Sequence, residues 1–244
     1  MFLLMSGLSA YLRIFLVLAL APAVILMVYV YRLDPLDKEP VNLLWSLILS
    51  GVCAGLIAGV LEGVGMQALG LFSGLDPRSA QFTIASDFLV VGVVEEGAKY
   101  WLMSRKTWDS PSFNCRCDGV VYAVFTSLGF AGMENIMYGL NYGTGVFLTR
   151  ALMAIPAHMG FAVLFGIFYG EAKYLSAQGR RGWSAACVVV GYALSVFLHG
   201  LYDSAAMVSS SASDSLFFLA VVVIYVVNFV VARQAAKHDK RFAY

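Results

Sequence analysis

The sequence is short of charged residues. Only 13% of its 244 residues are Asp, Glu, Lys or Arg, whereas soluble globular domains carry about 25%. Sixteen basic residues against fifteen acidic ones leave a net charge of +1. No basic surface is therefore available to neutralise a nucleic-acid backbone, and nucleic-acid binding is excluded. Hydrophobic residues instead make up 60% of the chain, which predicts an integral protein of a lipid bilayer.

Cysteine and histidine are also scarce, with four and three residues. Cys53 and Cys187 lie within apolar runs, and Cys115 and Cys117 form an isolated C-x-C pair between two runs. Neither arrangement implies a disulfide framework or a paired-cysteine metal site.

Long apolar runs predict an all-α, polytopic helical membrane protein that forms one transmembrane domain over residues 1–244. A crossing takes roughly 20 residues, so about seven transmembrane helices around an intramembrane polar cavity account for the chain. The run at 83–104 is the least clear, because charged residues interrupt it. The predicted helices are at about 12–31, 41–63, 83–104, 119–140, 147–170, 183–206 and 214–232.

The basic residues are distributed unevenly between the two sides of the predicted bundle. Twelve of the sixteen fall in alternate loops and the C-terminal tail. The opposite side holds only Arg78 and, near helix ends, Arg13 and Arg150. By the positive-inside rule, the N-terminus is expected outside and the C-terminus in the cytoplasm.

Ionisable side chains cluster where the membrane core is expected. Each costs a few kcal/mol at that depth on insertion scales, so such residues indicate function. Counting 1.5 Å per residue from the predicted cytoplasmic helix ends places four of them roughly 12–24 Å deep, in a common layer. The polar residues in these runs are Glu95, Glu96, Lys99, Glu134, Asn135, His158, His199 and Asp203.

Helical spacing indicates which of these groups share a face. Glu95 and Lys99 are an i, i+4 pair, and Glu96 points about 100° away from Glu95 around the helix. One carboxylate can pair with the lysine while the other faces a cavity as a general base. His199 and Asp203 also lie one turn apart, as in a carboxylate that orients an imidazole. A purely structural ion-pair network is the alternative, although such networks stabilise a bundle poorly.

Several motifs occur in a characteristic order, and together they resemble the PrsW family of intramembrane proteases. This family belongs with the CAAX prenyl endopeptidases and the bacteriocin-processing proteins. The resemblance runs from about Leu33 to Ala206. Its motifs are Asp34 with Lys38-Glu39-Pro40, the E-E-G-A-K of 95–99, Asp118-Gly119 with Tyr122, the G-F-A-G-M-E-N of 129–135 with Tyr138, His158, and the H-G-L-Y-D of 199–203.

The resemblance implies peptide-bond hydrolysis in a single-pass membrane protein, in a bacterial inner membrane. The substrates that the resemblance implies include anti-sigma factors, which are cut at the first step of regulated proteolysis. Glu95 would activate water, supported by Glu96 and Lys99. His199 and Asp203 would bind the scissile carbonyl or its oxyanion, and Glu134 would share the water. His158 has no certain counterpart, and Asn135 and Tyr138 are supporting residues.

The metal requirement stays open at the level of sequence. Glu134, His158, His199 and Asp203, with one acid of the Glu95–Glu96 pair, offer enough donors for Zn²⁺ with an open position, although no H-E-x-x-H motif is present. A zinc-assisted and a metal-free glutamic mechanism are both compatible with the motifs.

Two other classes of function compete with a protease. A proton- or cation-coupled transporter also uses buried Glu, His and Asp residues. It would predict an internal repeat, and the sequence has none that we recognise. A non-enzymatic scaffold on the same fold would be expected to lose some of the motif residues, and all of them are present.

Overall fold

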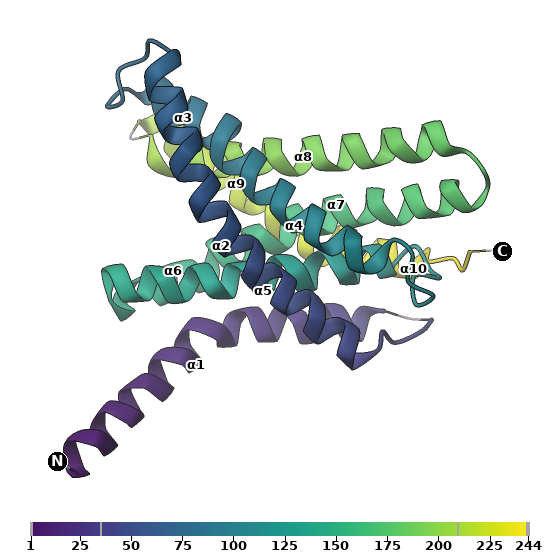
Figure 1. Cartoon of the computed structure of the whole chain (residues 1–244), viewed down its shortest axis with the longest axis horizontal. Helices are drawn as coiled ribbons and strands as arrows, with labels where there is room; N and C mark the ends of the chain where they lie inside the picture. Colours follow the sequence, from purple (N-terminus) through teal and green to yellow (C-terminus); the bar gives the residue numbers. More distant parts are fainter. Residues whose placement is uncertain (1, 35, 209, 243–244) are drawn as a thin grey trace.

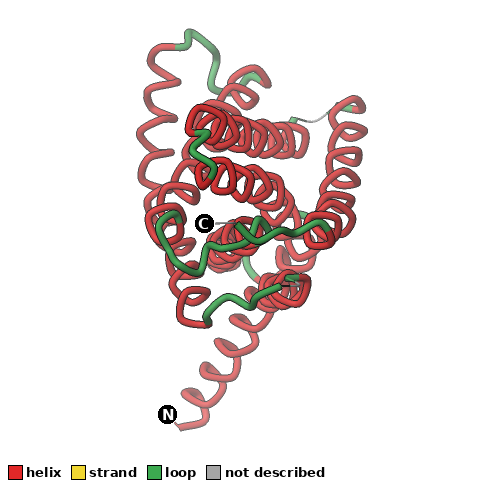
Figure 2. The backbone as a smooth tube through the Cα atoms, turned by 90° about the vertical axis from the view of Figure 1, so that its right-hand side faces the viewer, coloured by secondary structure: helices red, strands yellow, loops and turns green. Residues whose placement is uncertain are grey.

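The computed structural model describes residues 2–34, 36–208 and 210–242. Within them the regular secondary structure is helical apart from one β-bridge between Cys115 and Arg241. Figure 2 shows the helices joined by short loops, and both views show the start of α1 projecting from the bundle (Figures 1 and 2). The helices are α1 Phe2–Leu33, α2 Val41–Phe72, α3 Ala80–Ser86, the π-helix η1 Asp87–Gly92, α4 Val93–Thr107, α5 Asp118–Tyr142, the 3₁₀-helix η2 Thr144–Val146, α6 Phe147–Leu152, α7 Ala154–Ala177, α8 Arg181–Met207, α9 Ser211–Val226, the π-helix η3 Val227–Val231 and α10 Ala232–Lys237.

The prediction of a polytopic all-helical membrane protein is confirmed. Six described segments are long and apolar enough to cross a membrane, at 9–33, 41–72, 118–142, 144–177, 181–207 and 211–237. The predicted helix at 83–104 corresponds to α3, η1 and α4, which follow one another without a loop from Ala80 to Thr107. This stretch is not among the six, because its charged residues make it too polar. The predicted count of seven is therefore approximate.

Helix α5 forms the centre of the bundle, and most of its apolar stretch is buried. It packs closely against two neighbours because glycines remove side chains at the contacts. Gly129 of α5 lies against the backbone of Ile48 in α2, and Gly119 lies against Gly166 and Gly170 of α7. Figure 1 shows α7 and α8 running side by side. Because α2 packs on α5, α5 on α7 and α7 on α8, the side chains that these four helices turn inward lie near one another inside the bundle.

Substitution of Gly51 tests the contact between α2 and α5. A Cβ atom at Gly51 would overlap the carbonyl oxygen of Thr126 and lie 2.6 Å from the backbone nitrogen of Phe130. We expect Gly51→Ala to lower the free energy of unfolding by about 1–3 kcal/mol, the usual cost of overpacking. Gly59→Ala, on the same helix with no heavy atom within 4 Å, is the matched control and should not lower stability. Thermal unfolding in detergent measures both, and equal melting temperatures would contradict this packing.

The contact between η1 and α8 fixes the position of the acidic pair on α4 relative to α8. A Cβ atom on Gly92 would lie 3.1 Å from the carbonyl oxygen of Val196, and one on Gly200 would lie 2.6 Å from the ring of Phe88. Each glycine therefore allows the opposite helix to approach closely. The π-helical turn at Asp87–Gly92 immediately precedes α4, and such turns are frequent at functional sites. This packing brings Glu95 and Glu96 beside His199.

Candidate active site

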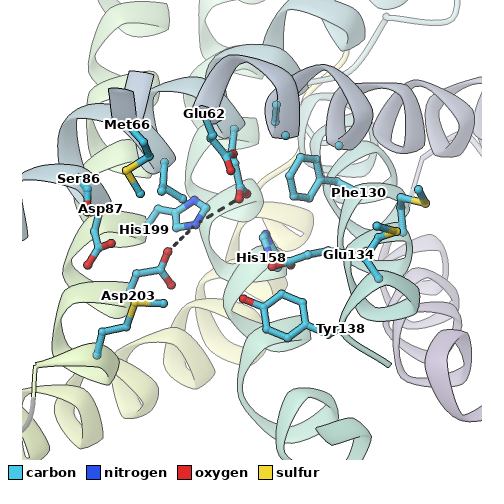
Figure 3. A pocket seen from close by; sticks show the side chains of 18 of the residues that line it. Glu62, Met66, Ser86, Asp87, Phe130, Glu134, Tyr138, His158, His199 and Asp203 are labelled. Carbon is cyan, nitrogen blue, oxygen red and sulfur yellow. Dashed lines mark hydrogen bonds and ion pairs between the residues drawn. The ribbon is translucent and has the colours of Figure 1, made fainter. Parts of the chain in front are cut away.

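A cavity of about 720 Å³ lies among the helices that carry the motif residues. Its walls come from α2, the α3–η1–α4 stretch, α5, α6, α7 and α8. Figure 3 shows His199 and Asp203 on one side of it and Glu134, His158 and Tyr138 on the other. The polar residues that line it are Glu62, Ser86, Asp87, Glu95, Glu134, Tyr138, Arg150, His158, His199 and Asp203.

The acidic pair on α4 binds a buried lysine. Lys99 Nζ lies 3.0 Å from Glu95 Oε2 and 2.9 Å from Glu96 Oε1, at i, i+4 and i, i+3. The sequence predicted one carboxylate on the lysine and the other free, but the ammonium binds both. Only Glu95 also lines the cavity. Glu95 is thus the acid of the pair that a substrate or a water molecule can reach.

His199 and Asp203 of α8 are in contact, as their i, i+4 spacing indicated. His199 Nε2 lies 3.2 Å from Asp203 Oδ2 and 3.8 Å from Glu95 Oε2. The other ring nitrogen, Nδ1, lies 2.8 Å from Glu96 Oε1. Both nitrogens therefore face carboxylate acceptors, an arrangement that a doubly protonated imidazolium satisfies. Protonated at both nitrogens, His199 places a positive charge beside Glu95.

The opposite wall is built around Glu134 of α5. Its Oε2 lies 2.9 Å from His158 Nε2 and 2.8 Å from Arg150 Nη2. Arg150 also donates to the Asn135 side chain at 2.8 Å, and its guanidinium lies 3.9 Å above the ring of Tyr138. Asn135 in turn donates to the carbonyl of Ala19 in α1. The predicted supporting residues Asn135 and Tyr138 thus hold the arginine that pairs with Glu134.

His158 connects the two walls. Lys99 Nζ lies 3.2 Å from His158 Nδ1, and because an ammonium only donates, Nδ1 accepts this hydrogen bond. His158 Nε2 then carries the hydrogen that is donated to Glu134. The centroid of the His158 ring lies 5.6 Å from that of the His199 ring. All six predicted catalytic residues therefore belong to one network, although Glu96 does not line the cavity.

Three cavity residues were absent from the predicted site. Glu62 lies near the end of the predicted helix at 41–63 and was not singled out, and Arg150 was counted as a cation near a helix end. Asp87 was noted only as an interruption of an apolar run, yet its Oδ2 accepts a hydrogen bond from Ser204 at 3.1 Å. The signal that could have found them is the same one that found the others, an ionisable residue next to a long apolar run.

The donor atoms of the site are already occupied by a side-chain cation. Among the described residues, Glu95, Glu96 and His158 are the one group whose three donor atoms lie within 4.8 Å of one another. Lys99 Nζ lies within 3.2 Å of an atom of each of these residues. Its ammonium takes the position that a cation would have, so these residues do not fit a metal as arranged. The predicted zinc ligands instead form two pairs, Glu134 with His158 and His199 with Asp203.

The D-x-x-x-K-E-P motif lies outside the cavity. Glu39 is buried before α2, and its Oε2 accepts a hydrogen bond from the Tyr122 hydroxyl at 2.8 Å. Burial raises the pKa of Glu39 to about 7, and the nearby charge of Asp34 acts in the same direction, against the hydrogen bond from Tyr122. These motif residues therefore join the loop before α2 to the first turns of α5 and serve the fold.

Comparison with known proteins agrees with this arrangement. Residues 39–232 match the family described as PrsW family intramembrane metalloprotease. Protease PrsW of Clostridioides difficile is 28% identical over 92% of both chains. Protease PrsW of Geobacillus kaustophilus is 32% identical over 75% of both chains, and that of Bacillus subtilis is 30% identical over 75% of this chain and 78% of its own. No solved structure matches the chain.

The relatives are bacterial, and the described part of the chain has six membrane-crossing candidates, so the protein is an integral membrane protein of a bacterium. The family match covers well over half of the sequence. The chain therefore belongs to the PrsW family of intramembrane proteases, which are peptide hydrolases.

Proposed function

We propose that the protein is an intramembrane endopeptidase that cleaves single-pass membrane proteins, with Glu95 activating the attacking water. The observation that carries this proposal is the position of Glu95. It is the acid of the α4 pair that lines the cavity, and its Oε2 lies 3.8 Å from the Nε2 of His199. A water molecule beside Glu95 would thus lie next to a group able to stabilise the oxyanion.

In the proposed reaction, Glu95 accepts a proton from water as the water oxygen attacks the scissile carbonyl. The negative charge that develops on the carbonyl oxygen is stabilised by the Nε2–H of His199, which shares its hydrogen between Asp203 and the carbonyl oxygen while Glu96 holds Nδ1. Preorganised donors of this kind are usually the largest electrostatic contribution to catalysis. Lys99 fixes the Glu95 carboxylate, so the base is oriented before the substrate binds.

The opposite wall would complete the water site. Glu134 is fixed by Arg150 and His158, and its carboxylate lines the cavity. We assign Glu134 the role of positioning the water or the substrate amide.

The proposed mechanism has no metal step, because the ammonium of Lys99 lies among the three closest donors. We expect elemental analysis of the active, purified protein to find far less than one zinc ion per chain, and activity to survive dialysis against a chelator. One tightly bound zinc ion, whose removal abolishes cleavage, would contradict this assignment. Lys99→Ala is the informative variant, because it would free the three donors and should increase zinc binding while lowering metal-independent activity.

The cavity also suggests the side of the membrane at which cleavage occurs. Its lining includes Pro77 from the α2–α3 connection, Phe82 from α3 and Tyr142 from the end of α5. By the distribution of basic residues this is the outer side. Single-pass proteins with a bond near their outer membrane boundary are the substrates that fit, and an anti-sigma factor cut at its first step is one such protein.

Orientation can be tested with reporter fusions. We expect the N-terminus outside and the C-terminus in the cytoplasm, which requires the α3–η1–α4 stretch to count as a crossing. A phosphatase fused after Arg78 should be active, and one fused at the C-terminus should be inactive. A cytoplasmic fluorescent reporter should give the reverse pattern. An active phosphatase at the C-terminus would contradict seven crossings in this orientation.

Cleavage itself is tested by reconstituting the purified protein in liposomes with single-pass reporter peptides and mapping products by mass spectrometry. We expect cuts in the outer half of the transmembrane segment. Proton or cation flux through the liposomes without any cleavage would instead support a transporter.

A further inference from the structure

Glu62 of α2 lines the cavity but belongs to none of the motifs described above. Figure 3 shows Glu62 at the side of the cavity that α2 forms. An ionisable residue in a membrane helix is costly and usually serves a function. The proposed roles of the other residues leave Glu62 without one.

Glu62 differs from the other cavity acids in its partners. Glu95, Glu134 and Asp203 each lie within 3.2 Å of a lysine, arginine or histidine nitrogen. Asp87 accepts a hydrogen bond from Ser204. Within the described ranges, Glu62 has no hydrogen-bond or ion-pair partner. Every cation that reaches the cavity is therefore committed to another carboxylate.

This difference determines which acid can carry a proton. A carboxylate held by a lysine, an arginine or an imidazolium is stabilised in its ionised form and has no proton to donate. An unpaired carboxylate surrounded by other acids at membrane depth is unfavourable, and the neutral carboxyl group avoids this cost. Among the described acids that line the cavity, Glu62 is the one with neither a hydrogen-bond nor an ion-pair partner, so no direct contact holds it in its ionised form.

Peptide hydrolysis needs such a proton. The leaving nitrogen of an amide departs as an amine, so it must be protonated as the C–N bond breaks. In the mechanism above Glu95 is the base, and no other residue of the site has been assigned as the acid. Enzymes that cleave with two carboxyl groups commonly divide these two tasks between them.

We propose that Glu62 is the general acid that protonates the leaving amine, an assignment that rests on the proposed protease function. Water loses one proton to Glu95 and adds as hydroxide to the carbonyl carbon. Glu62 then donates its proton to the nitrogen, the C–N bond breaks, and the products are a carboxylic acid and an amine. Glu62 is left as a carboxylate and Glu95 as a carboxylic acid. Transfer of the proton from Glu95 to Glu62 through cavity water restores the starting state.

The test compares two forms of one substrate. A single-pass peptide that the wild-type protein cleaves in liposomes is synthesised again with an ester in place of the scissile amide. An alkoxide leaves without prior protonation far more readily than an amide nitrogen, so the general acid matters less for the ester. We expect Glu62→Gln to lower kcat for the amide by about 100-fold or more and for the ester by less than about fivefold, in line with the usual contribution of an acid catalyst. Glu62→Asp, which retains a proton, should recover part of the amide activity.

Glu171→Gln is the matched control, because Glu171 is also a glutamate on a membrane helix but pairs with Arg116 and does not line the cavity. It should leave the rates on both substrates unchanged. Equal losses on the amide and the ester, or no loss on either, would overturn the role of Glu62. A wild-type protein that cleaves neither form of any tested peptide would overturn the protease function and this role together, so the two failures are distinguishable.

Discussion

Replacement of Glu95 by glutamine is expected to abolish detectable peptide hydrolysis while the protein stays folded. The amide is nearly isosteric with the carboxylate and its oxygen can still accept the hydrogen bond from Lys99, but it cannot take a proton from water. General bases contribute about 10²- to 10⁴-fold to rate, so we expect a loss in at least this range. Cleavage of a membrane-anchored reporter and thermal unfolding should be measured on the same preparation.

The neighbouring acid provides the control. Glu96 does not line the cavity but holds His199 at 2.8 Å and Lys99 at 2.9 Å, so Glu96→Gln should reduce activity through positioning and leave part of it. Near-normal cleavage by Glu95→Gln together with complete loss in Glu96→Gln would reverse the two assignments. If both variants were fully active, the proposed protease mechanism would fail.

Spacing along one helix predicted the contacts that lie within one helix. Glu95 with Lys99 and His199 with Asp203 are i, i+4 pairs, and both are in contact in the structure. Contacts between helices could not be obtained in this way. The hydrogen bonds from His199 to Glu96 and from Lys99 to His158 depend on how α4 packs against α7 and α8, which periodicity within one helix does not encode.

The same limit applies to the metal requirement, which the sequence left open between a zinc-assisted and a metal-free mechanism. From the residue types alone, two histidines and several acids offered a plausible zinc site. The sequence does not reveal that Lys99 reaches both Glu96 and His158, because these partners lie on different helices. The packing of the helices thus determines whether a set of donor atoms is open to a metal ion or is already occupied by a lysine ammonium.

Glu62 and Arg150 were missed for a different reason. An acid at the end of an apolar run is normally read as the point where a helix leaves the membrane, yet α2 continues to Phe72. Arg150 lies beyond α5 in the sequence, but the reversal of the chain through η2 and α6 returns it to Glu134 at 2.8 Å. Glu62 is a functional candidate because α2 continues past it along the cavity, and Arg150 is one because the chain folds back on the cavity.

Loss of His199 or of Asp203 is expected to reduce turnover by a large factor in each case, and the two losses should not add. His199 Nε2 lies 3.2 Å from Asp203 and is the group proposed to stabilise the oxyanion. Removal of one oxyanion donor typically costs about 10²- to 10³-fold in kcat. Asp203→Ala should approach this loss, because the imidazolium would lose the carboxylate that orients it.

A double-mutant cycle separates this coupled arrangement from two independent roles. If Asp203 acts only through His199, then once the imidazole is gone the carboxylate has nothing to orient, so the double variant should be little slower than His199→Ala alone. His199→Asn retains a hydrogen-bond donor and should keep more activity than His199→Ala, which a purely structural role would not produce. Additive losses would indicate that Asp203 contacts the substrate itself, as its position on the cavity wall permits. Full activity in His199→Ala would remove the proposed oxyanion site, and the charge on the carbonyl oxygen would then have to be stabilised from the opposite wall, where Arg150 is the cation available.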